Sequence, residues 1–398
     1  MTRLALKKVK TFILQFLITS FTLSPLAFIF YNSSNKTNTF SLSYQDCPCD
    51  FCHEIGAVTI PQTRNRSEQK NWTIIIYIAA DNDLRSFAAR NIKQMASIGS
   101  NEFVNILVHL DIRITGNKKI TRRYYVEKDK ILHMNAHDAS SQCMDSGNPK
   151  TLISCCEWAI NNYPAYEYAL FFWNHGTGII DPGYGRLINP AELFTFNPET
   201  NKLELDRSLG FLDLIDNLDQ NQFLRIDQKG ICWDDTTGNY LTNYKLETAL
   251  DTICRKILNG NKFSIIGFDA CLMSMLETAS LIKNYAHIMV GSQEVELGTG
   301  WNYAKVLSPF AYQSLEKNDF AKHIVQMYYK TYSMLTNDFT LSAINLNQII
   351  NLEKNLNSVA QLLLECLANQ KKQSVSQAIK ASRNRLICTH FDEPSYID

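Results

Sequence analysis

Short apolar runs alternate with amphipathic stretches along the middle of the chain. The first run, Trp72–Ala80, is continuous and ends at Asp81-Asn82-Asp83, a pattern typical of a strand buried on both faces of a parallel sheet. Further apolar runs predict strands over residues 103–110, 168–173, 263–268, 286–290 and 340–345, and a small edge strand over 122–126. Helical spacing between them predicts helices over residues 85–98, 149–162, 243–258, 272–284 and 319–335. This alternation indicates an α/β fold with a mostly parallel central sheet flanked by helices.

The first 31 residues have the pattern of an export signal. Arg3, Lys7, Lys8 and Lys10 precede the uncharged apolar stretch 12–31, and a basic flank before an apolar segment is typical of a signal peptide. We therefore expect an exported protein, secreted or periplasmic, whose signal is cleaved. An uncleaved signal anchor is the alternative, because a stretch of this length can just span a bilayer; it would be the protein's sole contact with a membrane. A buried core helix is a further alternative.

A polar segment, residues 32–71, follows the export signal and is predicted to be a linker. It is rich in Asn, Ser, Thr and Gln and shows neither helical nor strand periodicity. Within it, Cys47-Pro-Cys49-Asp-Phe-Cys52-His53 offers soft ligands for a metal or a redox site. No second ligand pair follows at zinc-finger spacing, so incidental thiols or a local disulfide are favoured over a metal site.

Two later segments depart from the alternation of strands and helices. Residues 181–229 carry Pro, Asn, Asp and Leu without a steady period, which predicts a surface insertion. Residues 346–398 are predicted to be a C-terminal helical segment, because apolar side chains recur there at helical spacing. These positions are Leu346, Ile349, Ile350, Leu356, Val359, Leu363 and Leu367. We expect this segment to pack on the domain; a partner-binding helix is the alternative.

Composition and charge exclude several classes of protein. The chain has 398 residues, of which 45% are hydrophobic and 20% charged, and its formal net charge is +0. This is the composition of an ordinary globular protein, not of a disordered or collagen-like chain. Without a net positive charge there is no long-range attraction to a phosphate backbone, so no nucleic-acid partner is expected. The 11 cysteines are an odd number, which leaves at least one thiol unpaired in a monomer.

Two strand-end loops carry reactive side chains. The predicted strand 168–173 leads into Asn174-His175-Gly176, and the strand 263–268 leads into Asp269-Ala270-Cys271. Ligands bind at the carboxyl ends of the strands in an open α/β sheet. If both strands are parallel in one sheet, the imidazole and the thiol share one rim and can meet.

The residue types in these loops suit nucleophilic catalysis. Cys271 begins a predicted helix, where the macrodipole and the unpaired N–H groups stabilise a thiolate. An imidazole can take up and release a proton under physiological conditions, so His175 can exchange a proton with the thiol. Gly176 lets a carbonyl group approach its N–H closely. From spacing alone, a small core cysteine and a structural histidine stay open as alternatives.

Five segments extend the pattern across the chain. In order, they are Trp72–Leu84, Trp173–Gly178, Gly230–Leu241, Gly267–Glu277 and Gly291–Tyr303. Together they resemble the clostripain family of cysteine peptidases over roughly residues 72–345, which is then the expected peptidase domain. The resemblance extends more broadly to caspases, legumains and gingipains, and it implies a caspase-like three-layer sandwich.

The resemblance implies a role for each candidate residue. Cys271 becomes the nucleophile, His175 the general acid and base, and the backbone N–H groups of Gly176 and Cys271 the oxyanion hole. The resemblance also implies cleavage of proteins or peptides after Arg or Lys, with Asp269 in the S1 pocket. A carboxylate there complements either basic side chain. A helix N-cap is the alternative role for Asp269.

The loop after residue 290 departs from the family pattern. Family S1 pockets can use a second acidic residue there, and this chain offers Glu294 and Glu296 but has Asn302 in its Trp-Asn-Tyr segment. From the residue pattern alone, the pairs Glu294/Glu296 and Asp234-Asp235 are expected to be solvated. A bound cation is the alternative for both pairs.

The resemblance also bears on activation and cofactors. Family members can cleave themselves between the histidine and the cysteine. The candidate processing sites in this chain are Arg186, Lys202, Arg207, Arg225 and Lys229. No cofactor is expected to be required, although some members use calcium and a Ca²⁺ ion stays open; no EF-hand spacing is present. The chain ends at Asp398 in a segment that commonly continues in the family, which implies a shortened version.

The sequence therefore leads to one hypothesis and two rivals. The hypothesis is an exported cysteine endopeptidase that cleaves after Arg or Lys through a Cys/His dyad and an acyl-enzyme. The first rival is a membrane-tethered, catalytically inactive caspase-like binding module. The second rival is a metal or redox protein centred on residues 47–53.

Overall fold

The computed structural model describes most of the predicted peptidase domain. The described residues are 40–41, 50–56, 58–61, 67–114, 118–178, 194–205, 230–368 and 372–384. The export segment 12–31, the cysteines Cys47 and Cys49, and every candidate processing site except Lys202 lie outside them. Among the described residues, no helix has both the length and the apolar composition needed to cross a bilayer.

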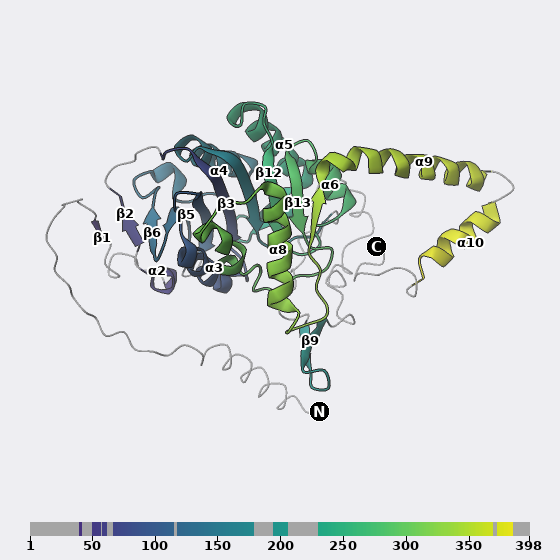
Figure 1. Cartoon of the computed structure of the whole chain (residues 1–398), viewed down its shortest axis with the longest axis horizontal. Coiled ribbons are helices and arrows are strands. Elements are labelled where there is room, and N and C mark those ends of the chain that lie inside the picture. Colours follow the sequence, from purple (N-terminus) through teal and green to yellow (C-terminus); the bar gives the residue numbers. More distant parts are fainter. Residues whose placement is uncertain are drawn as a thin grey trace. The chain divides into compact units, whose positions relative to one another are not determined.

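A ten-stranded sheet forms the middle layer (Figure 1), in the order β1-β2-β6-β5-β4-β3-β7-β12-β13-β14. Five adjacent parallel strands form its centre: β4 (Val104–Arg113), β3 (Lys70–Ala80), β7 (Ala165–Trp173), β12 (Phe263–Asp269) and β13 (Ala286–Gly291). The flanking strands are β5 (Lys119–Glu127), β6 (Lys130–His133), β2 (Val58–Ile60) and β1 (Phe40–Ser41) on one side, and β14 (Ser342–Asn345) on the other. β5 and β14 both run antiparallel to the central strands that they pair with.

The central strands are apolar on both faces. In β3, Ile74, Ile76 and Ile78 enter one core cluster, while Ile75 and Tyr77 enter the other, and all five are 0% exposed. Successive side chains of a strand point to opposite faces of a sheet, so the continuous apolar run belongs to two cores at once. Complete burial of a large apolar side chain contributes about 1.5–3 kcal/mol to stability.

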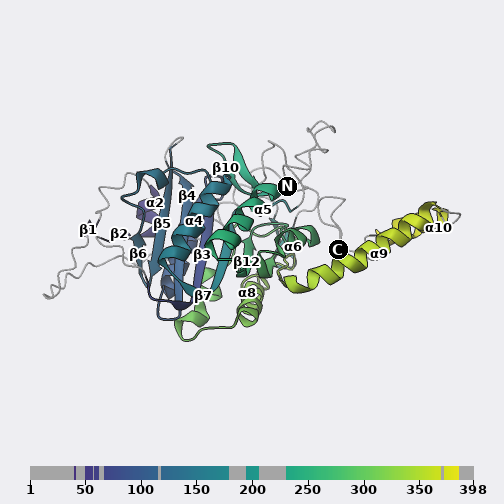
Figure 2. The ribbon, with the colours of Figure 1, turned by 90° about the horizontal axis from the view of Figure 1, so that it is seen from above.

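Helices cover both faces of the sheet (Figures 1 and 2). The helices packed on the first core are α2 (Asp50–Ile55), α3 (Arg85–Ile98), α7 (Tyr303–Val306) and α8 (Lys317–Tyr332). Those packed on the second core are α4 (Pro149–Asn162), α5 (Asn243–Thr252), the π-helical turn η4 (Ile253–Ile257) and α6 (Leu276–Ile282). Short 3₁₀ turns are η1 (Ala139–Ser141), η5 (Ser308–Ala311) and η6 (Leu346–Gln348). The predicted three-layer α/β sandwich is confirmed.

Most predicted elements lie near their predicted bounds. α3 and α4 match the helices predicted at residues 85–98 and 149–162. α4 begins where the Asn148 side chain accepts a hydrogen bond from the Lys150 N–H and Pro149 takes the first turn. The predicted edge strand 122–126 is wrong in position, because β5 lies inside the sheet between β4 and β6.

The predicted linker is partly folded. Phe51 and Ile55 of α2 are buried in the first core, and β2 pairs with β6. The prediction of a linker over residues 32–71 is therefore wrong for β1, α2 and β2, and for residues 70–71, where β3 begins. These elements are too short to show a clear period in the sequence.

Two hairpins lie within and after the predicted insertion. β8 (Phe194–Asn197) pairs with β9 (Lys202–Leu205), and β10 (Gly230–Asp234) pairs with β11 (Asn239–Thr242). The first hairpin contacts the turn after α8, where the Leu203 N–H donates to Leu335 O at 2.7 Å. Part of the predicted insertion therefore has its own regular structure.

The C-terminal helices are mostly exposed. α9 (Ile349–Ala368) and α10 (Lys372–Ser382) form in the segment predicted to be helical. Within α9 only Ile349 is buried, while Leu356 and Leu363 are 44% and 37% exposed. The expectation that residues 346–398 pack on the domain is therefore wrong for most of α9. Helical periodicity defines an apolar face but not what covers it.

Candidate active site

The loops that carry His175 and Cys271 leave the sheet side by side. β7 and β12 are parallel neighbours whose last residues, Trp173 and Asp269, are paired in register. A Cβ atom on Gly176 would lie 2.5 Å from the carbonyl oxygen of Cys271. The two loops are therefore in direct contact, and position 176 has room only for glycine.

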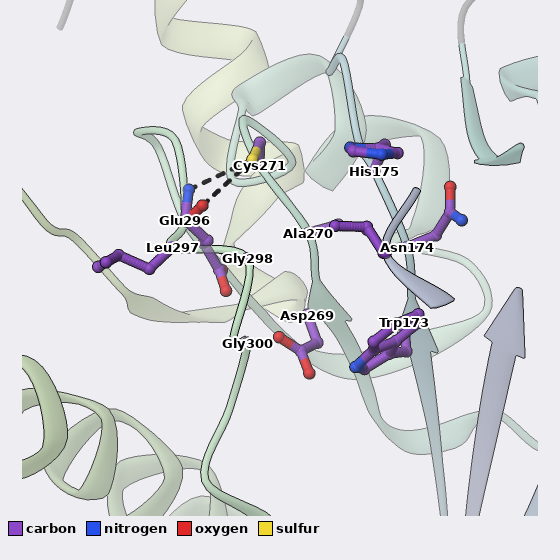
Figure 3. A pocket seen from close by; sticks show the side chains of 11 residues that line it. Trp173, Asn174, His175, Asp269, Ala270, Cys271, Glu296, Leu297, Gly298 and Gly300 are labelled. Carbon is purple, nitrogen blue, oxygen red and sulfur yellow. Dashed lines mark hydrogen bonds between the residues drawn. The ribbon is translucent and has the colours of Figure 1, made fainter. Parts of the chain in front are cut away.

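His175 and Cys271 line the same pocket (Figure 3). Asp269 and Glu296 line this pocket as well. His175 is 1% exposed, Cys271 2%, Glu296 3% and Asp269 4%. A thiol, an imidazole and two carboxyl groups therefore belong to one largely buried site.

Cys271 lies in a turn and not at a helix N-terminus. The following helix, α6, begins only at Leu276. Leu272 has a φ of 60°, a left-handed conformation that does not continue into a helix. The prediction that a helix macrodipole stabilises the Cys271 thiolate is therefore wrong.

The backbone of Glu296 holds the Cys271 thiol. The Glu296 N–H donates to Sγ at 3.3 Å, and the thiol donates to the Glu296 carbonyl oxygen, with 3.8 Å from Sγ to oxygen (Figure 3). Burial raises the pKa of the Cys271 thiol far above its ordinary value; the Glu296 N–H opposes this shift, and the carboxyl groups of Glu296 and Glu294 add to it. The thiol is therefore protonated in this arrangement and needs a base to become a nucleophile.

An acidic side chain holds one ring nitrogen of His175. Nε2 lies 2.6 Å from Oδ1 of Asp83, a residue that follows β3, the strand beside β7. The other nitrogen, Nδ1, is buried and has no hydrogen-bond partner among the described residues. Because Nε2 is engaged with Asp83, Nδ1 is the nitrogen left to exchange a proton with a thiol.

Asn174 fixes the conformation of the histidine loop. Its side chain donates to Ala79 O at 2.6 Å and accepts from the Trp233 N–H at 2.8 Å. Ile231 of the same hairpin forms a β-bridge with Gly176. The position of the imidazole therefore depends on the end of β3 and on the hairpin that follows the insertion.

The sequence patterns did not single out Asp83 or Asn174 as site residues. In the sequence, Asp83 lies just after the first predicted strand, and Asn174 directly precedes the histidine. The rule that ligands gather at the carboxyl ends of parallel strands could have included Asp83. Its pairing with the imidazole depends on which strands are neighbours.

Asp269 is a buried acid in the pocket wall. Its Oδ1 accepts from the Trp301 N–H at 2.9 Å, and its Oδ2 accepts from the Tyr303 hydroxyl at 2.8 Å. The alternative role as a helix N-cap is wrong, because α6 begins well after this residue. Burial raises the pKa of Asp269 to about 7, although its hydrogen bonds with Tyr303 and Trp301 lower it.

The expected solvation of the acidic pairs is wrong for three of the four side chains. Glu294 and Glu296 are each 3% exposed, and Asp234 is 1% exposed. Glu296 is the member of its pair that lines the pocket beside Asp269. Asn302, the departure from the family pattern, caps α7 with its side chain.

One ammonium group contacts the three buried carboxyl groups of an acidic cluster near the histidine loop. Lys119 Nζ lies 3.0 Å from Asp111 and 3.9 Å from Asp81, and it also contacts Asp234. In the parts of the chain that the structure describes, no group of three or more His, Cys, Asp or Glu side chains could hold a metal ion. Lys119 supplies the positive charge that these carboxyl groups contact.

Comparison with known families identifies the class of protein. The model of the clostripain family matches residues 76–190 and 216–397, more than half of the chain. The chain belongs to the clostripain family, and it is therefore a cysteine peptidase with protein or peptide substrates. No curated protein matches its sequence significantly.

Solved structures similar to this chain include three C11 proteases. A secreted enzyme from Bacteroides thetaiotaomicron, in complex with an irreversible peptide inhibitor, is 21% identical with a TM-score of 0.47; the match covers 70% of this chain and 67% of that one. Iotapain, from the same organism, is 15% identical with a TM-score of 0.46, and the match covers 74% of this chain and 71% of iotapain. An inactive zymogen from Parabacteroides distasonis is 21% identical with a TM-score of 0.46, and the match covers 72% of this chain and 65% of the zymogen.

Proposed function

We propose that this chain is an exported endopeptidase that cleaves proteins after Arg or Lys, with Cys271 as the nucleophile and His175 as the general acid and base. The observation that carries the proposal is the single pocket lined by these two residues together with Asp269 and Glu296. Buried reactive groups that converge on one cavity are typical of an active site.

In the proposed acylation step, Nδ1 of His175 takes the thiol proton, and Sγ of Cys271 attacks the carbonyl carbon of the scissile bond. The backbone N–H groups of Gly176 and Cys271 donate to the oxyanion that forms. The C–N bond then breaks, and the leaving amine takes the proton from His175. A thioester between Cys271 and the substrate remains.

In the proposed deacylation step, water attacks the thioester carbonyl carbon while His175 accepts a proton from the water. The C–S bond breaks, the carboxylic acid product leaves, and the proton returns to Sγ. Asp83 keeps Nε2 hydrogen-bonded in both steps, which holds the ring and stabilises its positive charge. No cofactor takes part in this proposal.

Basic specificity rests on the acids of the pocket. Asp269 and Glu296 are buried next to each other, and a buried pair of carboxyl groups favours a cationic side chain over a neutral one. Gly298 and Gly300 line the same pocket, and a Cβ atom on Gly300 would lie 2.7 Å from Oδ1 of Asp269, so the backbone of this loop closely approaches the carboxyl group. We therefore assign the S1 pocket to this side of the site.

Export and self-cleavage belong to the same proposal. The basic and apolar pattern of residues 1–31 supports a cleaved signal, with an uncleaved anchor as the alternative. Among the candidate processing sites, Lys202 is held in β9, where Nζ donates to Ser333 O at 3.1 Å and to Asn337 Oδ1 at 2.7 Å. We expect processing at another basic residue of the insertion, which N-terminal sequencing of the mature fragments would identify.

Hydrolysis of fluorogenic peptides tests the proposed function. Peptides that end in Arg or Lys before the reporter should be cleaved, and matched peptides with norleucine or Gln should be cleaved poorly. Cys271→Ala should abolish turnover, and His175→Ala should lower it by about 10²–10⁴, the usual contribution of general acid–base catalysis. Activity that survives Cys271→Ala would refute the assignment of the nucleophile. An inactive wild-type protein that still binds peptide would favour the binding-module rival.

A further inference from the structure

Glu296 has a buried carboxyl group in the site that forms no ion pair with a described cationic side chain. Its carboxyl group is 3% exposed, and neither oxygen makes a hydrogen bond of normal geometry among the described residues, although Asp269 and the indole of Trp301 lie beside it. Burial raises the pKa of Glu296 well above its ordinary value, and the neighbouring Asp269 adds to the shift. An unpaired buried carboxylate is strongly unfavourable, so Glu296 carries a proton until a partner for its charge arrives.

The two acids of the pocket differ in how many partners they already have. Asp269 accepts hydrogen bonds from Trp301 and Tyr303, whereas the Glu296 oxygens make none of normal geometry with the described residues and only lie next to Asp269 and the Trp301 indole. Figure 3 shows the Glu296 side chain directed towards Asp269, on the side of the pocket that we assign to S1. Glu296 is therefore the acceptor that stays available to an ammonium or guanidinium group.

The backbone of the same residue touches the nucleophile. The Glu296 N–H donates to Sγ of Cys271, and the Glu296 carbonyl accepts from the thiol. Both contacts keep the thiol engaged with this loop. Gly298 and Gly300 follow in the loop and line the pocket, and glycines give a backbone the freedom to shift.

We propose that Glu296 is a specificity-determining residue that couples recognition of the cationic P1 side chain to release of the Cys271 thiol. The cation pairs with the Glu296 carboxylate, whose proton passes to solvent, and the loop shifts so that its backbone no longer engages Sγ. The thiol is then free to transfer its proton to His175. This inference rests on the proposed function, and it adds that the substrate itself prepares the nucleophile.

Alkylation of Cys271 by iodoacetamide tests this coupling without peptide hydrolysis. The probes are butylguanidine, which imitates the end of an arginine side chain, and butylurea, its neutral counterpart. Butylguanidine should accelerate alkylation of Cys271 by roughly tenfold, within the range usual for two coupled sites, and butylurea should not. Cys143 is exposed, so its alkylation, measured on its own peptide by mass spectrometry, serves as an internal reference that neither probe should change.

Variants assign the effect to Glu296. Glu296→Gln should lose the acceleration by butylguanidine, measured against its own basal alkylation rate, while the matched control Glu316→Gln, at an exposed position, should behave as wild type. Equal or slower alkylation of the wild-type protein with butylguanidine would overturn the proposal, and so would acceleration that persists in Glu296→Gln. The wild-type comparison decides the question even if the variant does not fold.

The two proposals can fail separately. Cleavage of basic peptides without any effect of butylguanidine on alkylation would refute the coupling and leave the proposed function intact. Absence of cleavage together with accelerated alkylation would refute the proposed peptidase specificity and leave the coupling within the pocket.

Discussion

At the scale of single residues, the proposed chemistry depends on three neighbouring strand ends. Asp83 follows β3, His175 follows β7 and Cys271 follows β12. The sequence predicted the second and third residues because each follows directly on an apolar run that ends in a reactive side chain. It did not predict Asp83, since the contact with Nε2 appears only when β3 and β7 are known to be adjacent.

Replacing Asp83 should lower the rate of the chemical step. Asp83→Asn retains an acceptor for the Nε2–H but loses the charge, so we expect kcat to fall about 10-fold, and Asp83→Ala should lower it about 100-fold, as for other residues that orient a reactive histidine. KM should stay within about twofold, because Asp83 does not line the S1 side of the pocket. Steady-state kinetics would measure both constants.

Asp319→Asn is the matched control for Asp83, because Asp319 lies exposed on α8 and should leave kcat unchanged. A change in KM without a change in kcat at position 83 would contradict a positioning role. Nitrogen NMR of the imidazole provides a test apart from turnover. A neutral ring should carry its proton on Nε2, and a proton on Nδ1 would contradict the account.

The pH dependence of KM should report the buried acid of the S1 pocket. Burial raises the pKa of Asp269 to about 7, so below pH 7 the free protein must lose a proton before the carboxylate can pair with a cation. KM for an Arg peptide should therefore rise by up to about tenfold for each pH unit below 7. A norleucine peptide should lack this dependence, and identical profiles for the two peptides would refute the assignment of Asp269.

At the scale of elements, the hairpin β10–β11 fixes the histidine loop. Trp233 binds the Asn174 side chain, Ile231 bridges Gly176, and Asp234 contacts the Lys119 ammonium. The sequence did not predict this hairpin as strands, because its register is interrupted between Ile231 and Asp234 and no clean alternation results. The folded hairpin therefore holds the histidine loop in place at the carboxyl ends of the central strands.

Removing the Lys119 charge should destabilise the protein. Asp81, Asp111 and Asp234 are all buried around this ammonium, and a buried ion cluster that loses its cation costs about 3–5 kcal/mol. Lys119→Met should lower the free energy of unfolding by this amount in urea denaturation. Lys322→Met, which removes an exposed ion pair with Asp319, should change it by less than about 1 kcal/mol. Equal effects of the two substitutions would contradict the account.

Substitutions along α9 should separate its buried start from its exposed remainder. Ile349→Ala should lower the free energy of unfolding by about 2–5 kcal/mol, because this side chain is 4% exposed in the second core. Leu356→Ala and Leu363→Ala should each change it by less than about 0.5 kcal/mol. Thermal unfolding followed by circular dichroism measures all three. A large loss at Leu363 would show that another part of the molecule covers this face in solution.

At the scale of the whole molecule, the sequence predicted the α/β sandwich because its central strands are apolar on both faces. The run at residues 72–80 is short for a buried helix and contains several β-branched Ile residues, which favours a buried strand. The sequence predicted a helix start at Cys271, where the structure has a turn. The apolar residues after position 271 resemble the start of a helix, but Leu272 adopts a left-handed conformation. The sequence could not show which of Glu294 and Glu296 lines the pocket, because both are acidic. Both are also 3% exposed, and the folded loop places Glu296 in the pocket wall.

Covalent trapping tests the central claim most directly. The wild-type protein is treated with an irreversible peptide inhibitor that carries Arg or Lys at P1, and its intact mass and peptide masses are measured. The account predicts one equivalent of inhibitor on Cys271, no addition to Cys271→Ala, and slower addition to His175→Ala. Addition to another cysteine, or hydrolysis of basic peptides by a protein that cannot be trapped at Cys271, would contradict it.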